Sequence, residues 1–238
     1  MIRYISKSVM LAASILVLAS CINNDDIATG HGKVKFYIGH NKSMADVKSE
    51  VSEAPDSFIV STTDSQNRQV EDLSGQYADF KKQEMIVPVG TYLIEAYNIT
   101  EEQAEAGRGA QRFWGSKNLE VTASNVSFAD FSCTMANARV SFTFDETFRN
   151  IYDMESTATP VKITASTSKN PGRKIEFNKN ATLEEGDSQI AYFNCDTENT
   201  VLNFTITARR KSDSQDKTFT QSIAIAPQNW YKVTVKAN

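Results

Sequence analysis

The chain has 238 residues, of which 40% are hydrophobic and 23% are charged, a composition typical of globular domains and not of disordered or membrane-spanning chains. Its length suits one large domain or two ordinary ones. The formal net charge is -4, and the one basic run, at 209–211, is closely followed by acidic residues. This charge distribution argues against nucleic acid, or an anionic membrane surface, as a partner.

The first twenty residues have the pattern of a signal peptide. A basic start with Arg3 and Lys7 precedes an apolar run at 9–18 and the small residues Ala19 and Ser20. The apolar run is too short to span a bilayer comfortably, which favours the apolar region of a signal peptide. The alternative interpretation is that it forms a buried helix of the folded domain. We predict that residues 1–20 are a lipoprotein signal peptide, which is removed.

Cys21 directly follows this leader. The sequence LASC at 18–21 resembles the bacterial lipobox, in which the thiol is acylated and the peptide is cut before the cysteine. One acyl chain binds a membrane marginally, whereas two or three hold a protein there durably. We predict Cys21 as the lipid attachment site, so that the membrane is a partner through this anchor. An ordinary signal peptide with an incidental cysteine is the alternative.

Residues 21–32 are mostly polar and include two glycines, which is typical of a flexible tether. From residue 33 onward, short apolar runs with period-two alternation predict strands. In a first domain, 33–135, strands are predicted at 33–38, 58–60, 85–87, 92–97, 119–121 and 126–128. Thr100 is expected to cap a short helix that Gly107 and Gly109 end.

A domain boundary is predicted near Met135 to Asn137, with almost no linker, since 131–144 contains no glycine or proline and alternates clearly near its end. The second domain, 136–238, is expected to contain one short helix around Phe148 and Tyr152 and strands at 140–144, 161–163, 175–177, 190–193, 202–208, 218–220, 222–225 and 230–235. Many short strands separated by turn signals are typical of β-sandwiches. We predict an all-β fold of two tandem, mostly antiparallel β-sandwich domains, Ig-like or transthyretin-like, with at most short helices.

Several stretches resemble a Bacteroidales lipoprotein family built on a domain of unknown function (DUF4493-like), similar in style to fimbrial and anchor lipoproteins. The most specific are FWGS at 113–116 and CTMANARV at 133–140, and the resemblance extends from about Gly30 to Asn238. It implies a lipid-anchored, all-β envelope protein with no assigned activity. It also implies that Asp25 and Asp26, just after the acylated cysteine, act as a signal for export to the cell surface.

The sequence offers little for catalysis. His31 and His40 are its only histidines, and we expect both in surface loops, which disfavours a histidine-rich metal site and a catalytic triad. No zinc-protease, CxxC, nucleophile-elbow or P-loop motif occurs in the sequence. We predict a protein that is not an enzyme and has no catalytic residue, metal site or cofactor.

Phe113 and Trp114 are the candidate contacts for a ligand or partner. They follow a polar segment that contains glycine, and aromatic rings with an apolar face and a polar edge are common in contacts with other molecules. The alternative is that Trp114 begins a strand and packs beneath the 100–112 loop.

Cys133 and Cys195 remain once Cys21 is assigned to the anchor. An even pair of cysteines in an oxidising compartment can form a disulfide. Both lie in apolar, strand-like stretches, where free buried thiols are equally common. The sequence leaves both alternatives open because it does not give the separation of the two Cα atoms.

These features predict a lipid-anchored outer-membrane protein that is exposed at the cell surface and has a non-enzymatic role in adhesion or surface-fibre assembly. Strand-rich domains suit this role because an exposed sheet edge can accept a strand from a partner, here a surface-fibre subunit. The alternative is a glycan-binding surface lipoprotein that works beside a nutrient importer. The two hypotheses differ in whether Trp114 contacts a sugar.

Overall fold

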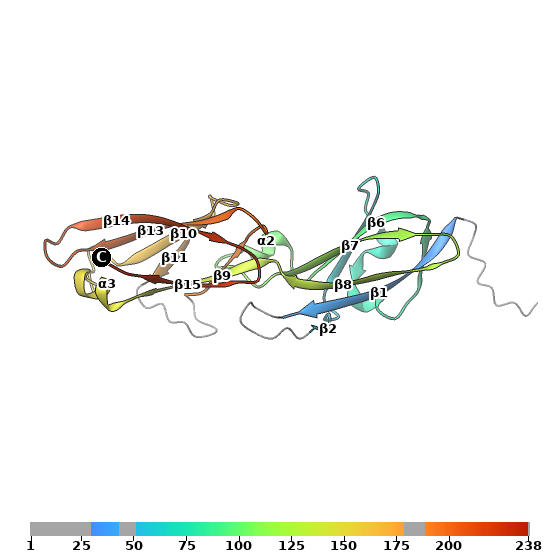
Figure 1. Cartoon of the computed structure of the whole chain (residues 1–238), viewed down its shortest axis with the longest axis horizontal. Helices are drawn as coiled ribbons and strands as arrows, with labels where there is room; N and C mark the ends of the chain where they lie inside the picture. Colours follow the sequence, from blue (N-terminus) through green and yellow to red (C-terminus); the bar gives the residue numbers. More distant parts are fainter. Residues whose placement is uncertain (1–29, 43–50, 179–188, 238) are drawn as a thin grey trace, which may run out of the picture.

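The chain folds into two β units that lie end to end (Figure 1), as described by a computed structural model for residues 30–42, 51–178 and 189–237. The predicted all-β fold with short helices is confirmed. The N-terminal unit contains β1 (His31–Asn41), β2 (Val51–Glu53), β3 (Ile59–Asp64), the 3-10 helix η1 (Glu71–Leu73), β4 (Gly75–Gln76), α1 (Tyr77–Phe80), β5 (Met85–Pro88), β6 (Gly90–Tyr97), α2 (Glu101–Ala104), β7 (Phe113–Val121) and β8 (Val126–Met135). The C-terminal unit contains β9 (Asn137–Phe144), α3 (Glu146–Ile151), β10 (Lys162–Thr167), β11 (Ile175–Asn178), β12 (Ala191–Asn194), β13 (Thr200–Arg209), β14 (Asp216–Ile225) and β15 (Trp230–Val235).

The strands of the N-terminal unit form one eight-stranded sheet in the order β2-β1-β8-β7-β6-β3-β4, with β5 also paired to β1. β7 and β8 are paired at only two positions, Phe113 with Met135 and Trp114 with Thr134. The two parts of the sheet that this short ladder joins enclose one core. Residues from both parts of the sheet, such as Phe36 of β1 and Ile94 of β6, belong to one buried cluster.

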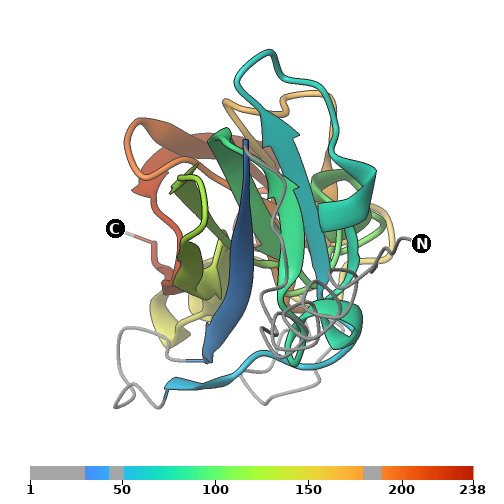
Figure 2. The same ribbon diagram turned by 90° about the vertical axis from the view of Figure 1, so that its right-hand side faces the viewer.

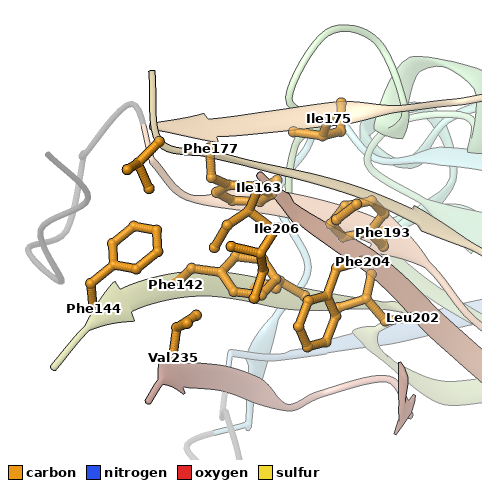
Figure 3. Close-up of a cluster of buried hydrophobic side chains, with 14 of the residues drawn as sticks. Phe142, Phe144, Ile163, Ile175, Phe177, Phe193, Leu202, Phe204, Ile206 and Val235 are labelled. Atoms are coloured by element: carbon orange, nitrogen blue, oxygen red, sulfur yellow. The ribbon is translucent and has the colours of Figure 1, made fainter. Parts of the chain in front are cut away.

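The C-terminal unit is a sandwich of a four-stranded sheet, β11-β10-β13-β14, and a three-stranded sheet, β12-β9-β15. Phe142 of β9 lies at the centre of its core, as Figure 3 shows. The Phe142 ring centroid is 4.8 Å from that of Phe177 and 5.1 Å from that of Phe204, and both contacts are edge-on. Phe142 therefore joins the two sheets through aromatic packing.

Each unit pairs its first strand in parallel with its last strand. β1 runs parallel to β8, and β9 runs parallel to β15, whereas the other strand pairs of the described residues are antiparallel. Figure 2 shows β1 in blue at the front of the N-terminal unit. A parallel pair needs a long crossover connection, and here the intervening strands of the unit supply it. This pairing closes each unit on itself.

The segment 100–112 of the N-terminal unit lies against β12 of the C-terminal unit. The backbone N–H of Tyr192 donates to the carbonyl of Arg108 at 2.8 Å, and the Arg108 Nε donates to the carbonyl of Ile190 at 3.0 Å. In the opposite direction, Arg173 Nη2 donates to the carbonyl of Gly107 at 3.1 Å. The two units are therefore joined by hydrogen bonds as well as by the chain at Ala136.

The prediction that both histidines lie in surface loops is wrong. β1 begins at His31, two residues before the predicted strand, and continues to Asn41. His40 is only 4% exposed, and its ring centroid lies 5.2 Å from that of Phe58 and 4.2 Å from that of Phe113. The alternation of buried and less buried residues continues through β1, so His40 occupies an inward-facing position.

Candidate functional site

The neighbouring residues Phe113 and Trp114 point to opposite faces of β7, as alternation in a strand requires. Phe113 is 7% exposed and packs in the core against His40, so it is not available as a contact for a ligand. Trp114 is half-buried, and its indole Nε1 donates to Glu95 Oε1 at 3.1 Å. Of the two predicted contacts, only Trp114 can meet another molecule.

Trp114 lines a cavity of about 440 Å³ between the two units. This volume lies within the range of about 300–1,000 Å³ that is usual for small-molecule sites. The N-terminal unit contributes strands β6, β7 and β8 and the start of α2, and the C-terminal unit contributes three loop segments. The lining residues are Glu95, Glu101, Arg112, Trp114, Thr134, Met135, Ala136, Lys169, Cys195, Asp196, Thr197, Pro227 and Gln228.

Lys169 connects the two walls of the cavity. Its amine donates to Glu101 Oε1 of the N-terminal unit at 3.0 Å and to Asp196 Oδ1 of the C-terminal unit at 2.8 Å. Burial lowers the pKa of Lys169, but the hydrogen bonds to Asp196 and Glu101 outweigh this effect and hold the pKa above its usual value. Lys169 is therefore a charged, already paired group.

Arg112 lines the same cavity with an unpaired side chain. Its backbone is held on both sides, because its N–H donates to Asn137 Oδ1 at 3.4 Å and its carbonyl accepts from Ala136 N at 2.7 Å. Its Nε is buried without a hydrogen-bond partner. Within the described ranges, the guanidinium makes neither an ion pair nor a hydrogen bond, and so it has donors to offer a ligand.

Trp230, the second tryptophan of the chain, is placed differently. Arg139 lies over its ring at 3.8 Å from the centroid, and Lys232 lies at 4.0 Å. Its Nε1 donates to Ser141 Oγ at 3.0 Å. The part of the chain that the structure describes places no such cation on the ring of Trp114.

Cys133 and Cys195 are free thiols, so the disulfide that the sequence left open is not formed. Cys133 lies in the core of the N-terminal unit and Cys195 in that of the C-terminal unit. The Cys133 thiol donates to the carbonyl of Ala96 at 3.3 Å. Burial raises the pKa of each thiol to about 12. Since the two cysteines lie in separate cores, they could meet only if one of the units unfolded.

β14 is a second feature with an unused surface. It lies at the end of its sheet and pairs with β13 along all ten of its residues. The other strands at sheet ends have only two to six residues each. In β14 only Ile225 is buried, and Phe219 is 37% exposed. No strand within 30–42, 51–178 or 189–237 pairs with its outer side.

A hollow of about 320 Å³ lies beside β14, between this strand and the end of β15. Six of its eight lining residues are hydrophobic, and five of these belong to the core or pack against it, whereas polar atoms supply nearly half of the lining surface. Its lining residues are Phe148, Tyr152, Ile206, Phe219, Gln221, Val235, Lys236 and Ala237. The free edge of β14 and this hollow form a continuous surface, which we call the β14 edge.

The predicted leader, anchor and tether fall largely outside the part of the chain that the structure describes. The leader 1–20, Cys21 and the tether as far as residue 29 lie outside the described residues. The described residues contain no group of three or more side chains of the kinds that bind metals, and none of their helices is both long and apolar enough to cross a membrane.

Comparison with known proteins gives a family and a set of distant structural relatives. No curated protein matches the sequence significantly. A proposed cell adhesion protein of Bacteroides fragilis is similar at 9% identity and a TM-score of 0.40, over 87% of this chain and 93% of that one. A group described as proposed polysaccharide-binding proteins, from Bacteroides thetaiotaomicron, is similar at 10% identity and a TM-score of 0.43, over 86% and 91%. A proposed adhesin of Bacteroides ovatus is similar at 10% identity and a TM-score of 0.45, over 79% and 76%.

Similarities as distant as these carry no functional assignment. The family model is the stronger finding, because it covers residues 30–238, which include both β units. The chain belongs to the family defined by the domain of unknown function DUF4493.

Proposed function

We propose that this protein is a non-enzymatic adhesion or fibre-assembly protein of the cell surface, which binds its partner at the β14 edge. The length and exposure of β14 carry this proposal. Natural proteins usually shorten, cover or charge their edge strands, because an open edge pairs readily with another chain. A ten-residue edge strand with a single buried residue is therefore better explained as a binding surface.

The chemistry of the β14 edge suits an extended protein segment. The outer backbone groups of β14 would form the ladder with an incoming strand, which supplies affinity without regard to sequence. The hollow lined by Phe219, Ile206 and Val235 would receive alternate apolar side chains of that strand, which supplies specificity. A surface-fibre subunit with an exposed strand is a partner of this kind.

Substitution of Phe219 tests the proposal. A lysine at this position places a charge in the hollow, while Phe219, already 37% exposed, contributes little to the core. We expect Phe219→Lys to reduce co-purification with surface fibres, and attachment of cells that display the protein, by at least tenfold. Ile86→Lys is the matched control, since Ile86 is a 54% exposed apolar residue of the other unit. Wild-type behaviour of Phe219→Lys would contradict the proposal.

The anchor is also part of the proposal. Acylation of Cys21 would hold the protein on the outer membrane, and the polar tether that follows would lift the two β units from the lipid. Cys21→Ala should abolish labelling with palmitate and release the protein from the membrane fraction. Protease treatment of intact cells, before and after replacement of Asp25 and Asp26, tests whether the protein is displayed outside. Retained palmitate labelling in Cys21→Ala would exclude this anchor.

Glycan binding is the second candidate function, and the position of Trp114 in the cavity between the units favours it. Binding of the purified protein to a glycan array, with loss of binding in Trp114→Ala, would support this function. Fibre association that is unaffected by Trp114→Ala would support assembly instead. The two functions use different surfaces, so each can be tested alone.

A further inference from the structure

The cavity between the units has the groups that bind a sugar ring. Its apolar side is the half-buried ring of Trp114, which the hydrogen bond from Nε1 to Glu95 holds in one orientation. An aromatic ring fixed by a polar edge offers a flat apolar face at low entropic cost. Trp230 cannot do the same, because Arg139 and Lys232 lie over its ring.

Arg112 supplies the polar contact that points most directly to a ligand. Its buried Nε lacks a hydrogen-bond partner, and a buried donor without a partner costs about 1–3 kcal/mol. Hydrogen bonds of its backbone with Asn137 and Ala136 hold the main chain of Arg112 at the cavity wall. The two terminal nitrogens of the same guanidinium are not among the buried atoms and also make no hydrogen bond within the described residues, so a ligand oxygen in the cavity can accept from them.

The charges of the cavity decide between acidic and neutral ligands. Three carboxylates, Glu95, Glu101 and Asp196, face two cations, Arg112 and Lys169, so that the lining carries one net negative charge. Two of the carboxylates are already paired with Lys169. A ligand carboxylate could pair with Arg112 but would add a further negative charge beside the three carboxylates of the lining. Hydroxyl groups, in contrast, can accept from Arg112 and donate to Glu95 or Asp196.

We propose that this cavity binds a neutral pyranose unit of a glycan, stacked on Trp114 and hydrogen-bonded by Arg112 and Glu95. This proposal rests on the second candidate function above and assigns its site and ligand class. Thr134 and Gln228 line the same cavity, where the Gln228 amide Nε2 donates to the Thr134 hydroxyl at 3.5 Å, and both would contact further hydroxyls of the sugar. Since both units contribute lining residues, a bound sugar would contact both and hold them together.

Binding to glycans of defined charge tests the proposal. The full mature protein is applied to an array of neutral and uronic-acid-containing glycans, and the strongest neutral ligand is then titrated by calorimetry, with trigalacturonate as the acidic comparison. We expect neutral glycans to bind and trigalacturonate to bind at least tenfold more weakly. The affinity for the neutral ligand should fall about tenfold in Arg112→Gln and at least as much in Trp114→Ala, with Arg112→Lys retaining part of it.

Phe219→Lys is the control that separates this site from the β14 edge. It should retain sugar binding, whatever its effect on fibre association, and an unfolding curve for each variant shows whether its fold is kept. Three results would overturn the proposal: an array without any bound neutral glycan, a preference for trigalacturonate, or unchanged affinity in both Arg112→Gln and Trp114→Ala. Loss of fibre association alone would bear on the β14 edge and not on this cavity.

Discussion

Two glycines of the segment 100–112, which packs on β12, should differ sharply in their tolerance of a side chain. Gly109 has a φ of +85°, and a Cβ there would lie 2.6 Å from the carbonyl oxygen of Tyr192 and 2.8 Å from that of Ala104. Gly107, two residues earlier, has a φ of +56°, and a Cβ there would have no atom within 4 Å. Gly107→Ala therefore measures the backbone cost alone, and Gly109→Ala adds the cost of a collision.

The structure gives the size of the difference. A non-glycine residue in the left-handed region costs about 1 kcal/mol, and this cost lowers the free energy of unfolding of both variants. Gly109→Ala must also displace the carbonyl of Tyr192, which accepts from Arg173 Nη1 at 2.9 Å. A hydrogen bond to a charged group contributes about 1.5–3 kcal/mol. We expect a loss of about 3 kcal/mol in the free energy of unfolding for Gly109→Ala and about 1 kcal/mol for Gly107→Ala.

Urea unfolding followed by circular dichroism measures both losses. Hydrogen exchange at the Tyr192 amide adds a local measurement, because this N–H donates to the carbonyl of Arg108 at 2.8 Å across the junction. Protection of this amide should fall in Gly109→Ala and remain close to wild type in Gly107→Ala. Equal losses of stability in the two variants would show that segment 100–112 does not pack on β12 as described.

Three further predictions concern buried groups. Burial, and to a smaller extent the charge of Lys42, hold the pKa of His40 below its usual 6.5. As the pH falls, the unfolded chain therefore takes up a proton at this histidine before the folded chain does. The free energy of unfolding should fall as pH decreases from 7.5 to 5, and it should fall less steeply in His40→Gln. Because burial raises the pKa of both thiols to about 12, Cys133 and Cys195 should resist iodoacetamide at pH 8 in the folded protein and react without reductant in urea; rapid labelling of either in the folded protein would be inconsistent with the structure. Phe142→Ala should lower the free energy of unfolding by about 4 kcal/mol in urea titrations, and a loss below about 1 kcal/mol would mean that Phe142 is not central to its core.

Local patterns in the sequence predicted what local physics determines. Thr100 caps α2 as expected, since its hydroxyl accepts from the N–H of Gln103 at 3.1 Å, and the Gln103 side chain completes the capping box. Alternation also located most of the strands. It did not place His40 correctly, because the predicted strand ended at Ile38 and left His40 just past it, whereas β1 continues to Asn41 and His40 faces inward.

The pairing of distant segments could not be predicted in this way. Nothing in the sequences of β1 and β8 shows that they pair in parallel, because alternation determines which face is buried and not which strand lies alongside. The cavity joins Trp114, Lys169 and Gln228, which are far apart in the sequence. The free edge of β14 also depends on topology. The strand has an open side because it is the last strand of its sheet, and the sequence does not show which strand is last.

The most direct test of assembly at the β14 edge is photo-crosslinking on the cell surface. A photoreactive residue is placed at the exposed position Thr220 of β14, with Ile86 of the other unit as the control position. We predict adducts between Thr220 and an extended segment of a fibre subunit, their loss when Phe219→Lys is added, and none from position 86. Absence of adducts at Thr220, or an equal yield from position 86, would contradict binding at this edge.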